Sequence, residues 1–311
     1  MQIDLAVASG AIADFYAPEP LFDRVHRIAV RRAEGARRLD ALLREGGYDA
    51  VAASYFHPAL YPKVGHLFPR GGPCVLSFAE DNGLLRESDR ARPALRLRSS
   101  LQRNEAARLV DLLELAGPVA PLEPWAPRFD PSETHAARAA FERLNPAGRP
   151  LVALHPGAAR AEKRWIWERW FELAQRLEER GIPCAFIDGG ESIGEIRRGV
   201  EERNLAARAV EPLPLRALAG LLSHASAFVT TDSGPKHLAY LAGTPTVEIY
   251  GPTDERRWGA LFEPDKHIAV RRCAWDLMPE ERDGLAENHQ CALVEIDDVW
   301  RALERFLPRQ G

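Results

Sequence analysis

The sequence is poor in cysteine, in long apolar runs and in charge of one sign, and each shortage excludes a class of protein. Its 311 residues include four cysteines, Cys74, Cys184, Cys273 and Cys291, and the absence of any CxxC pair argues against a zinc site. No apolar run is long enough to cross a bilayer, and no signal peptide is visible. A net charge of -4 and an isoelectric point near 6.2 lack the basic excess of nucleic-acid-binding proteins. We therefore expect a cytoplasmic protein without a nucleic-acid partner.

What is present is the composition of an ordinary globular protein. Hydrophobic residues make up 46% of the chain and charged residues 28%, and the length suggests one large or two ordinary domains. Strand-like and helix-like segments alternate in both halves, which argues for parallel sheets in an α/β protein. A proline-rich link at residues 118–131 joins the halves, so we expect two Rossmann-like domains with a cleft between them.

The periodicity of apolar residues predicts the individual elements. In the first half we expect strands at 3–8, 24–30, 49–54 and 73–78, and helices at 11–16, 32–45, 58–68, 101–115 and 133–144. The polar residues 81–98 lack clean periodicity, which predicts a long loop that is either functional or disordered. In the second half we expect strands at 151–154, 184–187, 227–231, 244–251 and 267–270, and helices at 167–180, 192–203, 213–223, 235–243 and 297–307.

One stretch, residues 227–251, has the pattern strand, turn, helix, turn, strand. The turn at 232–235 ends with a proline suited to the first helical position. Lys236 and His237 then fall in the first helical turn, where the helix dipole disfavours positive charge. An anion bound there by the free backbone N–H groups and both side chains removes that cost. The pattern predicts an anion site, and the alternative is an ordinary helix start.

A second loop, residues 155–165, follows the first expected strand of the second half. Gly157 and the small Ala158 allow a ligand close to the backbone. Lys163 and Arg164 can give charge-assisted hydrogen bonds to phosphate oxygens, or can be ordinary solvated surface charges. Both loops follow the C-terminal ends of strands of one expected sheet, so they can line one crevice. Two such loops suit a nucleotide diphosphate better than a single phosphate.

Taken in order, these motifs resemble those of the bacterial lipopolysaccharide heptosyltransferases, glycosyltransferase family 9. Residues 154–158 with 163–165 are similar to that family's small-residue turn followed by Lys-x-Trp. Residues 232–237, Asp-Ser-Gly-Pro-Lys-His, match its Asp-(Thr or Ser)-Gly-x-x-His. Residues 250–258 contain its downstream Gly-Pro-Thr-Asp and a tryptophan. No single piece is specific, but the combination in this order is.

The resemblance implies a GT-B fold, with two Rossmann-like domains facing a cleft and the sugar nucleotide on the C-terminal domain. It implies a shortened N-terminal acceptor-side domain at 1–148, a donor-binding domain at 149–295, and a C-terminal helix at 296–311 that crosses back to the N-terminal domain.

The resemblance also implies the residues that bind the donor. Lys163 would contact the diphosphate, the loop at 232–237 would hold the diphosphate and sugar, and Glu191 or Glu195 would contact the ribose or base. The predicted donor-binding residues are Gly157, Ala158, Lys163, Glu191, Glu195, Asp232, Ser233, Gly234, Lys236 and His237.

The beginning of the sequence departs from the family pattern. Family members begin with a strand and a Gly-Asp loop, and that Asp is the proposed general base. Residues 21–25 resemble a later strand of the family, so on one interpretation the first βα unit and its catalytic Asp are absent. A rival register makes residues 10–14, Gly-Ala-Ile-Ala-Asp, a variant of the Gly-Asp loop. Asp14 is then the candidate catalytic base. We favour the first register because residues 22–25 fit their counterpart closely.

The implied function is an inverting glycosyltransferase that needs no metal or other cofactor and uses an ADP-activated sugar, with heptose as the expected sugar. Its expected partners are the nucleotide-sugar donor and a lipopolysaccharide-core, glycolipid or related glycan acceptor. A cytoplasmic location is compatible with peripheral contact at the inner membrane. Two alternatives remain: a sugar-nucleotide epimerase, which shares the two-domain fold, and a catalytically impaired homologue that binds a nucleotide sugar. The missing Gly-Asp loop favours the impaired homologue more than any other feature of the sequence does.

Overall fold

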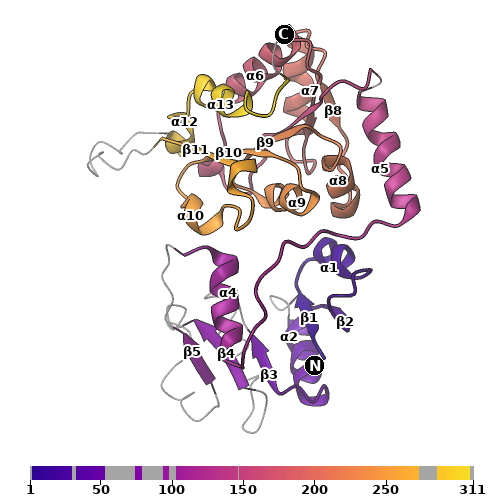
Figure 1. Ribbon diagram of the computed structural model, residues 1–311, viewed down its shortest axis with the longest axis vertical. Coiled ribbons are helices and arrows are strands. Elements are labelled where there is room, and N and C mark those ends of the chain that lie inside the picture. Colours follow the sequence, from indigo (N-terminus) through magenta and orange to yellow (C-terminus); the bar gives the residue numbers. More distant parts are fainter. Residues whose placement is uncertain are drawn as a thin grey trace. The chain divides into compact units, whose positions relative to one another are not determined.

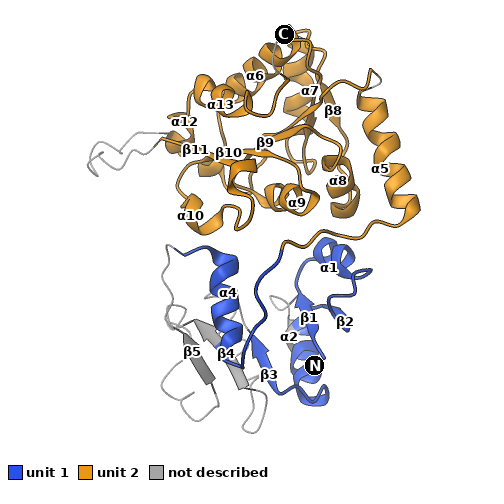
Figure 2. Cartoon of the chain, in the orientation of Figure 1, with its two compact units in different colours: residues 1–123 blue, residues 124–311 orange. Residues whose placement is uncertain are grey.

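A computed structural model describes residues 2–29, 33–52, 74–78, 94–97, 103–145, 147–272 and 286–308 of the chain. The chain divides into two compact units, residues 1–123 and 124–311, which are coloured separately in Figure 2. The domain limits at 148 and 295 that the sequence suggests stay a prediction.

Unit 1 contains short parallel strands and three helices within its described residues. Strands β1 (Asp4–Val7) and β2 (Arg24–Arg27) form one pair, and β3 (Ala50–Ala52), β4 (Cys74–Phe78) and β5 (Ala94–Leu97) form a sheet in that order. The helices are α1 (Gly10–Tyr16), α2 (Ala33–Glu45) and α4 (Glu105–Glu114).

The elements of unit 1 follow the predicted alternation of strand and helix, with one correction. The expectation of a loop throughout 81–98 is wrong at β5, because a four-residue Ala-Leu-Arg-Leu alternation is too short to stand out beside polar residues. Leu76 of β4 and Leu112 of α4 are both buried and pack together. The helix expected at 58–68 lies outside the described residues.

Unit 2 is built on one six-stranded sheet in which every neighbouring pair is parallel. The spatial order is β11-β10-β9-β6-β7-β8. The strands are β6 (Val152–His155), β7 (Cys184–Ile187), β8 (Arg208–Val210), β9 (Ala227–Thr231), β10 (Thr246–Tyr250) and β11 (His267–Arg271).

Helices cover both faces of this sheet (Figure 1). The longer ones are α5 (Pro131–Leu144), α6 (Trp167–Glu179), α7 (Ile193–Glu202), α8 (Leu215–Leu222), α9 (Gly234–Ala242) and α13 (Ile296–Leu303). The short ones are η4 (Ala161–Lys163), α10 (Glu255–Trp258), η5 (Pro264–Lys266) and α12 (His289–Ala292). Helix α5 packs on α8 and α8 on α9, while α13 packs on α6, β10 and β11.

The two faces of the sheet differ in chemistry because successive side chains of a strand point to opposite faces. Val247 and Ile249 of β10 join the apolar core that α6 and α13 cover. The alternate residues of β10, Thr246, Glu248 and Tyr250, are just as buried but carry polar groups. One face is therefore a conventional apolar core, and the other holds a buried polar cluster.

The order of the strands creates a switch point between β6 and β9. From β6 the chain proceeds through β7 to β8 on one side, and from β9 through β10 to β11 on the other. Because loops at such a point leave in opposite directions, a crevice forms at the carboxyl ends of the two strands. Strands β6 and β9 pair directly, with His155 opposite Thr230. The expectation that the two loops lie at one sheet edge is confirmed.

Among the helices that the structure describes, none combines the length and apolar character that a membrane span needs.

Candidate functional site

The site begins where β9 ends and α9 starts. Asp232 follows the strand, Ser233 is the N-cap residue, and Gly234 and Pro235 open the helix. The Ser233 hydroxyl lies 3.3 Å from His155 Nδ1 and 3.3 Å from the Thr231 carbonyl oxygen. Among the described contacts, it makes no capping hydrogen bond to the N–H groups of the helix. The N–H groups of the first helical turn are therefore not occupied by their own cap side chain, as an anion site requires.

Asp232 is the centre of the charged contacts. Its Oδ2 accepts hydrogen bonds from Lys163 Nζ at 2.7 Å and from the Thr253 hydroxyl at 2.6 Å. Its Oδ1 accepts a hydrogen bond from Lys236 Nζ. The side chains of Lys163, Asp232 and Lys236 are 19%, 6% and 0% exposed. The structure therefore unites three predicted site residues, and Lys163 is the one that reaches the surface.

These contacts decide the charge states. Burial alone would raise the pKa of Asp232, but the charge of Lys236 and the hydrogen bonds from Lys163, Lys236 and Thr253 bring that pKa down to about 2. Burial lowers the pKa of Lys236, and the neighbouring Asp232 carboxylate opposes that decrease. At neutral pH the cluster holds an ionised carboxylate, and its low pKa makes it a weak general base.

The loop after β6 carries Lys163 to this cluster. The Gly157 carbonyl oxygen accepts a hydrogen bond from the Thr231 hydroxyl at 2.7 Å, which ties the loop to β9. Ala158 is buried, and its carbonyl oxygen accepts from Arg164 Nε at 3.1 Å. Lys163 then closes the short helix η4. Two side-chain-to-backbone bonds thus fix the segment that positions the lysine.

Beneath this loop lies a histidine that the sequence did not single out. His155 is buried at the end of β6, and burial lowers its pKa to about 4, although the nearby Asp188 opposes the decrease. A Cβ atom on Gly157 would lie 2.8 Å from Asp188 Oδ1 and 3.2 Å from His155 Nε2. The glycine is required because any side chain would collide with this pair. His155 is neutral at physiological pH and can exchange hydrogen bonds with Ser233.

A second glycine contact brings the Gly-Pro-Thr-Asp segment to the site. Gly251 is buried, and a Cβ atom on it would lie 2.5 Å from Cys291 Sγ and 3.2 Å from the Glu162 carbonyl oxygen. The absence of a side chain lets the backbone approach η4 closely. Thr253, two residues on, can then reach Asp232.

The other predicted site residues are exposed. Glu191 lies in the loop after β7, 4.0 Å from Arg164, and both side chains are largely in solvent. Glu195 is exposed in the first turn of α7, His237 is exposed in the first turn of α9, and Asp14 is exposed on α1 of unit 1. His237 interacts electrostatically with Lys163, Asp232 and Lys236, and its ring packs edge-on against that of Tyr240. Among the described contacts, none joins Glu191 or Glu195 to the Asp232 cluster, and the roles of all four residues stay predictions.

Sequence reasoning missed Glu248, Tyr250 and Thr253 as well as His155. Glu248 is a charged residue within a buried strand, which was the available signal: Thr246, Glu248 and Tyr250 alternate along β10 on one face. Thr253 lies in the Gly-Pro-Thr-Asp motif, but a motif match alone does not indicate which atom it contacts.

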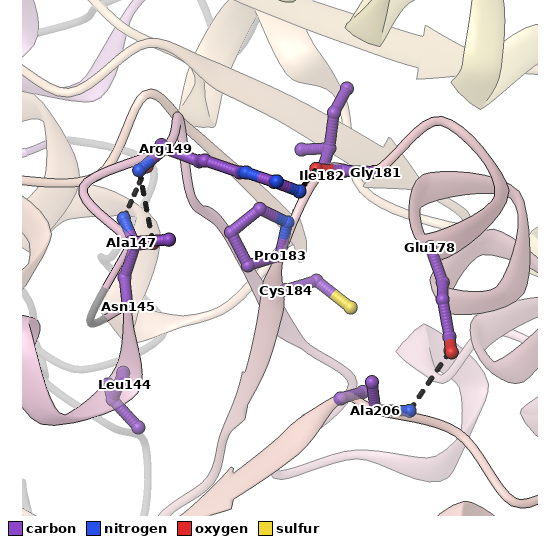
Figure 3. Close-up of a pocket in the computed structure, with 11 residues that line it drawn as sticks. Leu144, Asn145, Ala147, Arg149, Glu178, Gly181, Ile182, Pro183, Cys184 and Ala206 are labelled. Carbon is purple, nitrogen blue, oxygen red and sulfur yellow. Dashed lines mark hydrogen bonds between the residues drawn. The ribbon is translucent and has the colours of Figure 1, made fainter.

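A cavity of about 290 Å³ lies at the opposite edge of the sheet, near the amino ends of β6, β7 and β8 (Figure 3). Its polar groups contact one another: the Asn145 side chain accepts from the Arg149 N–H, and Glu178 accepts from the Ala206 N–H at 3.0 Å. These contacts connect the segments that lead into the strands. We assign them to the fold, and the candidate site is the crevice at the other edge.

Within the described residues, no group of three or more His, Cys, Asp or Glu side chains is arranged to hold a metal ion. Independence from metal stays a prediction.

The part of the chain that resembles known proteins includes the residues of the site. The family model for glycosyltransferase family 9 (heptosyltransferase) matches residues 95–281. The chain is 25% identical over 165 residues to lipopolysaccharide heptosyltransferase 3 of Escherichia coli K12, covering 51% of this chain and 47% of that protein. It is 33% identical over 128 residues to lipopolysaccharide heptosyltransferase 1 of Pseudomonas aeruginosa, covering 40% and 35%. The chain therefore spans about half the length of these relatives, or less.

Solved structures show the same fold over nearly the whole chain. A family 9 glycosyl transferase from Veillonella parvula matches with a TM-score of 0.78 at 16% identity, covering 98% of this chain and 88% of that one. An E. coli heptosyltransferase solved with ADP matches with a TM-score of 0.64 at 17% identity, covering 98% and 99%. The α/β fold of GT-B type predicted from the sequence is confirmed.

Proposed function

This chain belongs to glycosyltransferase family 9, the heptosyltransferase family, and from that premise we propose that it transfers a sugar from an ADP-activated donor to a lipopolysaccharide-core or related glycan acceptor. Its curated relatives are lipopolysaccharide heptosyltransferases, and one solved relative contains ADP, so heptose and ADP are the proposed sugar and nucleotide. The observation that carries the proposal is the meeting of Lys163 and Asp232 at the N-terminus of α9.

The proposed reaction is an in-line displacement at the anomeric carbon. An acceptor hydroxyl oxygen bonds to that carbon, the bond from the carbon to the diphosphate oxygen breaks, and the configuration inverts. A base takes the hydroxyl proton, and ADP leaves with the electron pair. Lys163 and the N–H groups around Gly234 offset the charge that develops on the diphosphate. We propose no metal in this step.

The remaining donor-binding roles follow from position. Gly157 and Ala158 let the diphosphate approach the backbone of the β6 loop, and Ser233 and His237 flank it at the start of α9. Asp232 is ionised and can accept hydrogen bonds from sugar hydroxyls. Glu191 or Glu195 would contact the ribose or base. Asp14 is the candidate base of the rival register, and an Asp14→Asn variant that transfers sugar at the wild-type rate would assign the base elsewhere.

The experiment that tests the proposal is a calorimetric titration with ADP-heptose, using ADP-mannose and UDP- and GDP-sugars for comparison. We expect selective binding of the ADP-sugar, and an increase in Kd of at least about tenfold in Lys163→Ala, from the loss of one charge-assisted contact. Lys266→Ala is the matched control, because Lys266 is an exposed lysine of the same unit that pairs with Glu263. Its Kd should equal that of the wild type.

The other outcomes discriminate among the alternatives. If no nucleotide sugar binds, the donor-site assignment is overturned. Binding of the ADP-sugar without transfer to any glycan acceptor indicates the catalytically impaired homologue. Conversion of the donor to a different free nucleotide sugar indicates an epimerase.

A further inference from the structure

Lysine is scarce in this chain, yet two lysines meet at one carboxylate. Of 41 basic residues, four are lysines and the rest are arginines. Lys163 and Lys236 both donate to Asp232. A lysine carries a compact ammonium that can be enclosed, whereas the planar guanidinium of arginine needs a broader space. The use of lysine here, in an arginine-rich chain, indicates that the site requires an enclosed point charge.

The two lysines stand in different environments. Lys163 is 19% exposed and contacts Oδ2 of Asp232 from the β6 loop. Lys236 is completely buried, and it contacts Oδ1 from below, on the first turn of α9. Its ammonium is therefore enclosed by protein. The sequence predicted a direct contact between Lys236 and an anion, but this burial suits an indirect role.

A second layer of polar groups supports Lys236. Its Nζ donates to the Tyr250 hydroxyl at 2.8 Å, and that hydroxyl donates to Glu248 Oε2 at 3.0 Å. Glu248 Oε1 accepts from the Tyr240 and Thr246 hydroxyls, each at 2.6 Å. All of these groups lie on the α9 face of the sheet.

The hydrogen bonds of this layer indicate how its charges are arranged. A hydroxyl has one proton, so Tyr250, which donates to Glu248, must accept from Lys236. Glu248 accepts three hydrogen bonds, as an ionised carboxylate does. Two cations, Lys163 and Lys236, thus balance two carboxylates, Asp232 and Glu248.

The balance matters when a diphosphate binds. A phosphate that takes Lys163 removes one of the two cations from Asp232. A buried carboxylate left without a cation is strongly unfavourable, so Asp232 would resist this exchange if Lys163 were its sole partner. With Lys236 beneath it, Asp232 remains paired after Lys163 has moved.

We propose that Lys236, held by Tyr250 and Glu248, is a positioning residue that keeps Asp232 paired and in place, so that Lys163 is free to bind the diphosphate of the donor. This inference rests on the proposed function. It assigns Lys236 an action through Asp232 instead of contact with the ligand. It also assigns Glu248, a residue outside the predicted site, to the control of donor affinity.

The test uses ADP as the probe, because ADP carries the diphosphate without the sugar that Asp232 is proposed to hold. The principal variant is Lys236→Met/Glu248→Gln, which removes one buried charge of each sign and keeps the volumes similar. A single substitution would leave an unpaired buried charge and could unfold the protein. We expect the double variant to bind ADP about tenfold more weakly, because Asp232 then retains Lys163. The melting temperature verifies that it is folded.

A rescue variant separates positioning from a purely structural role. Adding Asp232→Asn to the double variant removes the carboxylate that competes for Lys163, so ADP affinity should return to within about threefold of the wild type. A structural defect from losing Lys236 and Glu248 would not be repaired by a third substitution at Asp232.

The controls make each outcome decisive. Lys266→Met removes an exposed lysine and should leave the Kd for ADP unchanged, whereas Lys163→Ala should weaken it. If Lys163→Ala weakens binding but the double variant binds as the wild type does, the inference is overturned and the proposed function stands. Failure of the rescue in a folded triple variant also overturns the inference. If the wild-type protein does not bind ADP, both the inference and the proposed function are overturned.

Discussion

The strands of the two units differ in how completely they are covered. Every residue of β6, β7, β9 and β10 in unit 2 is buried. In unit 1, β1, β2 and β3 have residues that are half-buried or exposed. Helices on both faces explain the coverage in unit 2. The lesson is that the buried charges around Asp232 lie in the unit whose four central strands are fully buried, as a preorganised anion site requires.

Truncation of one large core side chain in each unit should show the difference most clearly. Trp170 of α6 is fully buried and packs edge-on against Trp165 at 5.2 Å. We expect Trp170→Ala to lower the free energy of unfolding of unit 2 by about 4 kcal/mol. Leu43→Ala in unit 1 should cost about 2 kcal/mol, because its neighbours are partly exposed and can relax. Urea unfolding followed by circular dichroism measures both, and equal costs would contradict the comparison.

A fall in pH should produce the next largest difference in stability between the two units. The folded pKa of His155 is about 4 and its ordinary value is 6.5, so between these pH values the unfolded chain binds the extra proton. The resulting stability is complete above pH 6.5 and is lost as the pH falls towards 4. The contribution of His155 to this loss should be on the order of 3 kcal/mol. His237 and His267 of the same unit add to it, because burial lowers their pKa values too. Urea unfolding at several pH values measures the loss, and His155→Asn should make the dependence on pH less steep.

In unit 1, Asp4 should lose its contribution to stability only at a lower pH than His155 does in unit 2. Hydrogen bonds from Tyr48 and His26 hold the pKa of Asp4 below 3.8. That contribution to stability is present above pH 3.8 and is lost only at lower pH. A loss of stability in unit 1 from Asp4 between pH 6.5 and 4 would show that this pairing is wrong.

The smallest expected effect tests that polar contact directly. The Tyr48 hydroxyl donates to Asp4 Oδ2 at 2.5 Å, and burial together with this bond raises the pKa of Tyr48 to about 12. Tyr48→Phe should lower the free energy of unfolding of unit 1 by about 1 kcal/mol, because His26 remains bonded to Asp4. Thermal unfolding measures the change. A variant as stable as the wild type would show that the hydroxyl contributes no net stability.

The sequence predicted unit 2 well where apolar β-branched runs are bounded by turns. The strands at Cys184–Ile187 and Ala227–Thr231 have the predicted bounds. Strand β8 (Arg208–Val210) was missed, because three residues that begin with arginine give no strand periodicity. Its place at the sheet edge comes from pairing with β7, which is a tertiary effect.

Tertiary contacts also limited how much of the site the sequence could predict. Motif spacing brought Lys163 and Asp232 to one crevice, because the ends of parallel strands share an edge. It could not predict that Lys236 points inward, since helical position alone does not tell whether a long side chain turns to solvent or to the sheet. Glu248 looked like an interruption of a strand, and its role depends on hydroxyl groups from other elements.

The pairing of β6 with β9 has a kinetic consequence. His155 and Thr230 are 75 positions apart in the chain, and among the described strands of this sheet no other two neighbouring strands join residues so distant in sequence. Closing that loop costs more entropy than joining β6 to β7, and non-local contacts of this kind form slowly. The crevice lies at this junction. A nascent chain that ends before β9 therefore has no anion site, whatever else it has folded.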